Sequence, residues 1–201
     1  MNKAGHMALV VPGLRDQIVL HQLLTVGWKF GGIVPVIYRM GWHDGEKFED
    51  KLGKLLAEID LLRRRADRLS LVGTSAGAGA VLNAFLERRT VVYKAVNVCG
   101  RLRPGTSVGV RGFDERTKSS RSFRESVMRF SEKERRLSAA DRKRILCIYP
   151  SLGDELVPRD TCVLEGANNT SVPTGEHMFS IGIAMMFGYV TKFLDKNERG
   201  L

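Results

Sequence analysis

Continuous runs of apolar residues recur along the chain and are separated by segments with a different pattern. The runs occupy residues 7–11, 32–38, 68–73, 94–100 and 144–150, with a weaker one near 161–164 or 170–172. Because apolar residues fill these runs instead of alternating with polar ones, the runs predict strands of a parallel sheet that is covered on both faces. Pro35 interrupts the second run and indicates an edge strand or a bulge there.

Between the runs, apolar residues return at steps of three and four positions, which is typical of amphipathic helices. These segments are residues 15–26, 46–65, 76–88 and 178–194. Strands that alternate with helices predict an α/β fold with a doubly wound, mainly parallel sheet. In such sheets ligands bind at the carboxyl ends of the strands, so functional residues are expected directly after strands.

Length and composition fit this prediction. The 201 residues, 43% of them hydrophobic and 27% charged, are enough for a single domain that spans residues 1–201. Cys99, Cys147 and Cys162 lack the spacing of a disulfide framework or a zinc site and are expected to be buried, reduced thiols. Without a recognisable signal peptide, this cysteine usage predicts a cytoplasmic location. The longest uncharged apolar stretch, 178–190, is shorter than the roughly 20 residues that span a bilayer.

The stretch LVGTSAGAGA, residues 71–80, places one hydroxyl among small residues at the end of a predicted strand. A sharp strand-to-helix turn is crowded, and Gly73 and Gly77 would let the strand and the helix approach each other. Ser75 would then sit on a strained backbone with its hydroxyl exposed, as in a G-x-S-x-G nucleophile elbow. A phosphate-binding glycine turn and a structural helix start are the alternatives. A dinucleotide fingerprint lacks its later acidic residue, and a P-loop lacks its lysine.

A serine hydroxyl is a weak nucleophile that needs a base, and the base needs an acid to orient it. The predicted strand 144–150 is followed by SLGDELVP, which places Asp154 in the next turn. The segment GEHMFS places His177 in the loop before the last predicted helix. The resulting order of Ser75, Asp154 and His177 is the one expected for a nucleophile elbow on this architecture.

Other residues compete for these roles. Glu155 and Asp160 are alternative acids, but Asp154 comes soonest after the strand. His43 is an alternative base that would give the wrong chain order for this fold. His21 lies within a predicted helix and is expected to be a surface or packing residue.

Four segments, VVPGL, GTSAG, GDELVP and GEHMFS, together make the chain resemble the α/β-hydrolase superfamily from residue 8 to about residue 194, apart from an insertion. The resemblance implies a minimal α/β-hydrolase fold with a Ser–His–Asp triad. It also implies an oxyanion hole formed by the backbone N–H groups of Ala76 and Leu14. The chain departs from many relatives in carrying Pro12 before Gly13 in place of histidine, and Glu176 in place of the usual glycine.

Three further residues are candidates for binding a substrate. Gly13 lies in the loop after the first predicted strand. Trp42 and His43 stand in RMGWHDG, directly after the second strand, and are expected to face the same edge of the sheet. The alternative is a loop that is anchored by a buried tryptophan.

The net charge of +10 is concentrated in residues 101–144, where fourteen Lys or Arg oppose six Asp or Glu. This segment is expected to form a small helical cap or lid, with Phe123, Val127 and Phe130 as a narrow apolar stripe on a basic helix. The charge could steer anionic substrates, bind nucleic acid or an anionic membrane, or form a solvated face. Nucleic-acid binding is disfavoured because no aromatic residues alternate with the cations as stacking platforms.

The pattern predicts a serine hydrolase of the carboxylesterase type that cleaves a small-molecule ester or thioester through an acyl-enzyme and needs no metal and no cofactor. One alternative is a non-catalytic module that binds an anionic partner through residues 101–144. Another is an acyltransferase or a peptidase that uses the same triad. The sequence leaves the oligomeric state open.

Overall fold

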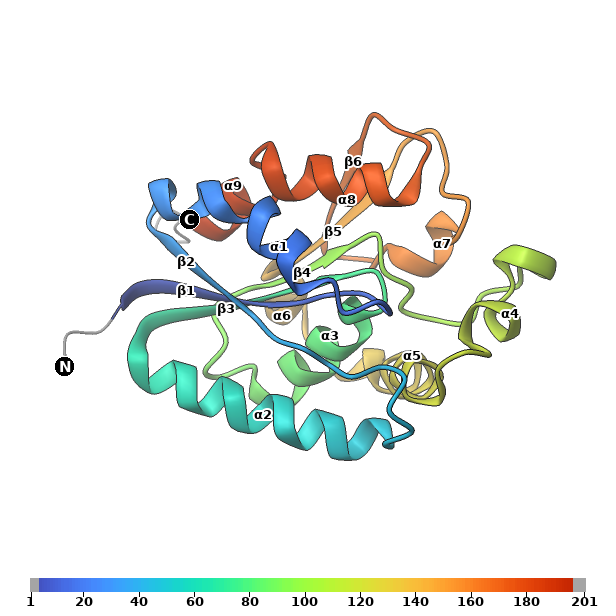
Figure 1. The fold of residues 1–201 in the computed structure, drawn as a ribbon, viewed down its shortest axis with the longest axis horizontal. Coiled ribbons are helices and arrows are strands. Elements are labelled where there is room, and N and C mark those ends of the chain that lie inside the picture. Colours follow the sequence, from blue (N-terminus) through green and yellow to red (C-terminus); the bar gives the residue numbers. More distant parts are fainter. Residues whose placement is uncertain (1–3, 197–201) are drawn as a thin grey trace.

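The computed structural model describes residues 4–196, in which six parallel strands form one sheet (Figure 1). The strands are β1 (Ala4–Val11), β2 (Ile33–Ile37), β3 (Ala66–Thr74), β4 (Ala95–Val98), β5 (Ile145–Pro150) and β6 (Asn168–Val172). Their spatial order is β2-β1-β3-β4-β5-β6, and every neighbouring pair is parallel. The predicted doubly wound sheet is therefore confirmed.

The two edge strands account for the irregular features of the sequence pattern. Pro35 lies in β2, which pairs only with β1, so its missing N–H costs the sheet no inner hydrogen bond. The weaker sixth strand is β6 at the other edge, where only Val172 of the five residues is buried. A strand that buries one side chain leaves little apolar signal in the sequence.

Helices cover both faces of the sheet. They are α1 (Ile18–Leu24), α2 (Phe48–Arg65), α3 (Gly77–Arg88), α4 (Phe113–Thr117), α5 (Arg121–Lys133), α6 (Ala139–Lys143), α7 (Arg159–Cys162), α8 (His177–Met186) and α9 (Tyr189–Asp195), with 3₁₀ turns η1 (Val26–Gly31), η2 (Gly109–Arg111) and η3 (Glu134–Arg136). Helices α2, α3 and α5 lie on one side in Figure 1, and α1, α8 and α9 lie on the other. Successive residues of one strand point to opposite faces of the sheet. Leu9 packs in the hydrophobic core on the side of α2, α3 and α5, whereas Ala8 and Val10 pack in the core on the side of α8 and α9.

The last predicted helix, residues 178–194, is wrong in one respect, because the structure divides it into α8 and α9. Gly188 lies between them with a φ of 84°. This left-handed conformation ends the first helix and redirects the chain, and glycine adopts it without strain. The apolar pattern continues through the break and therefore gave no sign of it.

The segment 101–144 joins the helix layer at α5. Val127 and Phe130 are fully buried, and α5 packs beside α2 and α3. The close approach to α3 depends on Gly79, where a Cβ atom would lie 2.9 Å from Ser126 Oγ. The short helix α4 lies farther out, beyond the carboxyl ends of the strands (Figure 1).

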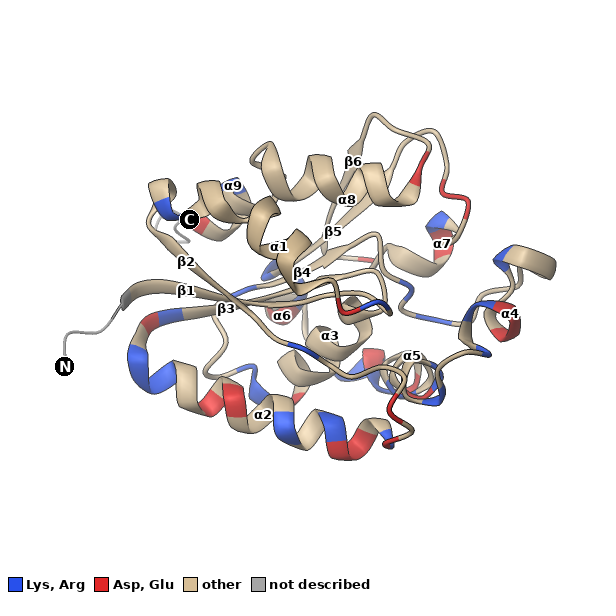
Figure 2. Cartoon of the chain, in the orientation of Figure 1, with Lys and Arg blue, Asp and Glu red and all other residues tan. Residues whose placement is uncertain are grey.

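The two helix layers differ in charge. Figure 2 shows Lys, Arg, Asp and Glu spread over α2, α4 and α5, whereas α1 and α8 carry none. Within residues 4–196, no single helix is long and apolar enough to cross a bilayer, although the bent pair α8–α9 meets that test by length and composition. The cysteines Cys99, Cys147 and Cys162 are buried, free thiols, as the sequence predicts.

Candidate active site

Ser75 occupies the tight turn between β3 and α3. Its φ of 51° lies in the left-handed region, which a side chain other than glycine rarely adopts. The neighbouring glycines make the turn possible. A Cβ on Gly73 would lie 2.4 Å from the carbonyl oxygen of Gly77, and a Cβ on Gly77 would lie 2.0 Å from that of Val11. Both positions therefore exclude any side chain, as the sequence analysis expects of a crowded elbow.

A second glycine loop contacts this turn from the end of β1. At Gly13, a Cβ would lie 2.9 Å from Ser75 Cβ, so the loop backbone touches the serine directly. At Gly100, after β4, a Cβ would lie 2.4 Å from the Ser75 carbonyl oxygen. The segments that follow three neighbouring strands, β1, β3 and β4, thus meet around Ser75 at the carboxyl edge of the sheet.

The structure brings Ser75, His177 and Asp154 together in a chain of hydrogen bonds. His177 Nε2 lies 3.0 Å from Ser75 Oγ, and His177 Nδ1 lies 2.8 Å from Asp154 Oδ2. An ionised carboxylate only accepts, so Nδ1 carries the proton and Nε2 is left to accept from the serine hydroxyl. His177 is 1% exposed and Asp154 is 6% exposed, which shields the pair from water.

Asp154 is held in place by its other oxygen. Oδ1 accepts hydrogen bonds from the backbone N–H groups of Leu156 and Val157, at 2.8 and 2.9 Å. Burial by itself raises the pKa of this carboxyl, but hydrogen bonding and attraction from His177, together with the two N–H groups, lower the pKa of Asp154 below its usual value. Asp154 is therefore a fixed carboxylate at neutral pH.

His177 is the first residue of α8, and two carboxylates bind the N–H groups of that first turn. Glu155 accepts from the backbone N–H of His177, with its two oxygens at 3.0 and 3.2 Å. Glu176 is the N-cap residue and accepts from the N–H groups of Met178 and Phe179. The residue that replaces the usual glycine thus fixes the helix that carries the histidine.

The two N–H groups expected to form an oxyanion hole lie on either side of the serine. Leu14 follows Gly13 in the loop against Ser75, and Ala76 follows the serine itself. Neither backbone N–H donates a hydrogen bond within the described residues 4–196. Both are therefore available as donors to a bound oxygen.

A cavity of about 210 Å³ opens beside Ser75 and His177. Leu156, Met178 and Ile181 supply apolar walls, and Gly13 also lines the cavity. In residues 4–196, no three His, Cys, Asp or Glu side chains are arranged so that they could hold a metal ion. The cavity is at the small end of ligand sites, so it suits a compact group.

The sequence predicts a surface or packing position for His21 and gives no sign that this residue lines the cavity. His21 is 3% exposed and lines the cavity. Its Nδ1 lies 2.8 Å from the carbonyl oxygen of Gln17, and its Nε2 lies 2.8 Å from Thr74 Oγ1. Burial lowers the pKa of His21, so the ring is neutral at pH 7 and accepts from Thr74. No signal in the sequence pairs these two residues.

Trp42 and His43 do not line the cavity, in contrast to the expectation that they bind substrate. Trp42 is 1% exposed, packs edge-to-face on Phe123 and donates from Nε1 to the carbonyl oxygen of Pro12 at 3.2 Å. His43 is exposed, and its Nδ1 lies 2.9 Å from the Ser119 carbonyl oxygen. The alternative of a loop anchored by a buried tryptophan therefore describes this segment, and Trp42 supports the loop that contains Gly13.

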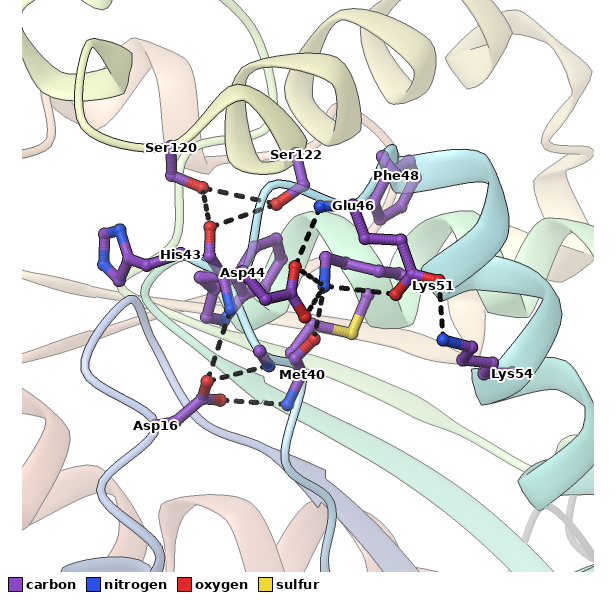
Figure 3. A network of polar contacts seen from close by, with 12 residues as sticks. Asp16, Met40, His43, Asp44, Glu46, Phe48, Lys51, Lys54, Ser120 and Ser122 are labelled. Atoms are coloured by element: carbon purple, nitrogen blue, oxygen red, sulfur yellow. Dashed lines mark hydrogen bonds and ion pairs between the residues drawn. The ribbon is translucent and has the colours of Figure 1, made fainter.

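The loop after β2 is held by a polar network (Figure 3). Asp16 accepts hydrogen bonds from the backbone N–H groups of Met40, Gly41 and Trp42, at 2.8 to 3.3 Å. Lys51, 2% exposed, donates to both oxygens of Asp44 at 2.6 Å and to the Met40 carbonyl oxygen. The charged groups of Asp16, Asp44 and Lys51 are therefore paired within this network, where they fix the shape of the loop.

Comparisons with known proteins bear on the fold. No family model matches the sequence, and no curated protein sequence matches it significantly. Solved structures do match. The ydeN gene product from B. subtilis is 16% identical with a TM-score of 0.64, over 95% of this chain and 100% of that one. The Paleococcus ferrophilus monoacylglycerol lipase is 12% identical with a TM-score of 0.64, over 96% of both chains.

A third similar structure is the meta-cleavage product hydrolase from Pseudomonas fluorescens, 13% identical with a TM-score of 0.64, over 96% of this chain and 92% of that one. Neighbours at this level of identity define the fold. The chain has the α/β-hydrolase fold, in a small form with six parallel strands.

Proposed function

We propose that the protein is a serine hydrolase in which Ser75 is the nucleophile, His177 the general base and Asp154 the acid that orients it. The observation that carries the proposal is the continuous chain of hydrogen bonds from Ser75 Oγ through the His177 ring to Asp154, at 3.0 and 2.8 Å, next to a cavity. Asp154 keeps the proton of the neutral His177 ring on Nδ1, and this tautomer leaves Nε2 able to accept the serine proton.

In this mechanism Ser75 Oγ attacks the substrate carbonyl while His177 Nε2 takes its proton. The N–H groups of Leu14 and Ala76 would stabilise the developing oxyanion, an effect worth about 3 to 4 kcal/mol per donor. His177 then gives the proton to the leaving group, and an acyl group remains on Ser75. Water, activated by the same ring, releases the acid and restores the serine.

The substrate class that we propose is an ester or thioester with a small acyl group. An alkoxide or thiolate leaving group demands less of the general acid than an amine does. The cavity of about 210 Å³ leaves room for only a short chain. The comparisons support an ester or thioester as the substrate class, because the similar structures include a monoacylglycerol lipase and a thioesterase domain from the curacin biosynthetic pathway.

Labelling with a fluorophosphonate, read by intact-protein mass, tests the nucleophile. We expect one adduct on the wild-type protein and none on the Ser75→Ala variant. Ser151→Ala is the matched control, since Ser151 is exposed at the end of β5 and does not line the cavity. A panel of p-nitrophenyl esters of increasing chain length follows, with the shortest acyl chains expected to react fastest.

Absence of an adduct on a folded protein would contradict the proposal. An adduct that persists in Ser75→Ala would assign the nucleophile elsewhere. Labelling of Ser75 without turnover in water, but with turnover when an alcohol or thiol acceptor is added, would replace the hydrolase with an acyltransferase that uses the same residues.

A further inference from the structure

Two arginines line the cavity, and no described residue pairs with their side chains. Arg15, in the loop after β1, and Arg116, in α4, both line the cavity that contains Ser75 and His177. Within residues 4–196, neither guanidinium group makes a hydrogen bond, an ion pair or a ring contact. A guanidinium carries a permanent positive charge and presents five donors in a planar fork. The two side chains that line the cavity thus carry ten N–H donors between them.

Arg116 is one of five cations in residues 101–144 that form no ion pair with a described carboxylate. Nine of the fourteen Lys and Arg side chains in residues 101–144 form ion pairs with carboxylates; they are Arg103, Lys118, Arg121, Arg124, Arg129, Lys133, Arg136, Arg142 and Arg144. Only two of the carboxylates that they contact, Glu49 and Glu87, come from outside the segment, so the segment keeps a positive excess. Of the described Lys and Arg residues in this segment, Arg116 is the one that lines the cavity of about 210 Å³, and it is unpaired.

A third arginine lies beneath Arg116 and fixes the segment on which it sits. Arg101 is 1% exposed, and its guanidinium donates to the carbonyl oxygens of Pro104, Arg111 and Leu156, at 2.5 to 3.4 Å. Among the described residues, its hydrogen-bond acceptors are all carbonyl oxygens and none is a carboxylate. Burial lowers the pKa of Arg101, and the charge of Arg116 lowers it further. A second cavity of about 20 Å³ joins Arg101, Arg116 and Ser75.

The nearby carboxylates are committed to other groups. Asp16 lines the cavity but accepts hydrogen bonds from three backbone N–H groups of the loop after β2. Asp154 is bound to His177 and two N–H groups, and Glu155 is bound to the N–H of His177. None of them pairs with Arg15 or Arg116. The lining of the cavity therefore includes two guanidinium groups that no described carboxylate neutralises.

We propose that the substrate carries a carboxylate or phosphate group and that Arg116, together with Arg15, binds this group in the cavity beside Ser75. This inference rests on the proposed function for its chemistry, but the anion site is defined by the arginines themselves. An anion between two guanidinium groups accepts charge-assisted hydrogen bonds, which are about twice as strong as neutral ones. The apolar side chains of Leu156 and Ile181 in the same cavity exclude water and strengthen the attraction.

Substrate selectivity tests the proposal in wild type, Arg116→Gln and Arg135→Gln. Arg135 is the matched control, because it lies in the same segment, is exposed, has no ion pair among residues 4–196 and does not line the cavity. Each protein is assayed for kcat/KM with p-nitrophenyl pentanoate and mono-p-nitrophenyl glutarate, which place the anion on the acyl side. Phenyl acetate and 4-carboxyphenyl acetate place it on the leaving-group side.

We expect the ratio of anionic to neutral kcat/KM to fall about 10-fold or more in Arg116→Gln for one of the two ester pairs, and that pair identifies the side that carries the anion. Arg135→Gln is expected to keep the ratio within about twofold, which corresponds to an unchanged site. Ratios that are equal in all three proteins would overturn the inference while leaving the hydrolase intact.

Binding of glutarate by calorimetry provides a readout that needs no catalysis. The Ser75→Ala variant is expected to bind glutarate, and the Ser75→Ala, Arg116→Gln double variant is expected to bind it at least 10-fold more weakly. Binding with no labelling of Ser75 in the wild type would support the anion site and contradict the hydrolase. Equal binding by both variants, or none by either, would overturn the anion site whatever the labelling shows.

Discussion

Two histidines meet two neighbouring hydroxyls at the end of β3, and only one of these pairs has the make-up of a nucleophile and base. His177 Nε2 lies 3.0 Å from Ser75 Oγ, and His21 Nε2 lies 2.8 Å from Thr74 Oγ1. Both rings line the same cavity, and both are almost fully buried. Distance and burial therefore do not separate the two pairs.

The difference lies in what each pair contacts on its other side. The Nδ1 of His177 donates to a carboxylate, Asp154, which stabilises the imidazolium that forms when the ring takes a proton. The Nδ1 of His21 donates to the carbonyl of Gln17, which gives no comparable charge stabilisation. Ser75 stands on a left-handed turn next to two unsatisfied N–H groups, whereas Thr74 is the last residue of a strand. Under the proposed function, it is these surroundings that make the Ser75–His177 contact reactive and leave the Thr74–His21 contact structural.

Replacing the carboxylate removes that difference and is expected to have the largest effect. In Asp154→Asn, the amide no longer enforces the neutral tautomer or stabilises the imidazolium. We expect kcat to fall by about 10³- to 10⁴-fold, measured with a short p-nitrophenyl ester. Asp160→Asn is the control, since Asp160 was the alternative acid and is exposed. A large loss in Asp160→Asn with little in Asp154→Asn would reverse the assignment.

Loss of the turn should be the next largest effect and should act on stability. In Gly73→Ala, the added Cβ would lie 2.4 Å from the Gly77 carbonyl oxygen, and this contact is with backbone that cannot move freely. We expect the free energy of unfolding to fall by about 3 kcal/mol, measured by denaturant unfolding. Gly53→Ala is the control, because no atom lies within 4 Å of its Cβ position in α2. An equally small effect at both positions would contradict this prediction, because it would show that the backbone around Ser75 can shift to accommodate the added methyl group.

Removing the hydroxyl of the second pair is expected to do less. In Thr74→Val, the buried Nε2 of His21 loses its donor, because valine keeps the shape but has no hydroxyl. We expect stability to fall by about 1 to 2 kcal/mol and kcat to change by less than about 10-fold. The two quantities are measured by denaturant unfolding and by ester hydrolysis. A loss of kcat comparable to that in Ser75→Ala would give Thr74 a direct part in the reaction.

A third pair, at the middle of β3, gives the smallest expected effect. His6 Nε2 lies 2.9 Å from Ser70 Oγ, and burial together with the charges of Arg68 and Lys94 lowers the pKa of His6 to about 4. The unfolded chain has a histidine pKa near 6.5, so between these values it takes up a proton that the folded protein does not bind. Stability should therefore fall as the pH is lowered through this window.

Between pH 7 and pH 5.5 this single group is expected to cost about 1 kcal/mol of the free energy of unfolding. The His6→Gln variant should lack this part of the pH dependence, measured by urea unfolding at several pH values. His43→Gln, at an exposed histidine, is the control and should keep the wild-type dependence. Identical slopes in wild type and His6→Gln would contradict the lowered pKa.

The sequence predicts the sheet and its helices well, because buried parallel strands are apolar along their whole length. It also leads to Ser75, since a turn too crowded for side chains leaves glycines at fixed positions on both sides of the serine. Asp154 and His177 follow from chain order once that turn is recognised. Their contacts join residues that are far apart in the chain, so the sequence predicts that the contacts form but gives no distances for them.

The sequence could not distinguish which residues after a strand face the cavity. Trp42 and His43 follow β2 as Gly13 follows β1, yet the Asp16 network turns their loop so that the tryptophan enters the core. The place of His21 in the cavity lining was equally hidden, because it depends on the contact of α1 with Thr74 at the end of β3. Such outcomes are decided by hydrogen bonds between distant segments, which leave no periodic pattern.

Ser75 and His177 are 102 positions apart in the chain. During synthesis on a ribosome, the serine emerges long before the histidine, and α8 takes its place only beside β5 and β6. A nascent chain that has completed β3 therefore carries the elbow without its base. Under the proposed function, the growing polypeptide is chemically inert, and its reactivity switches on in one late folding event.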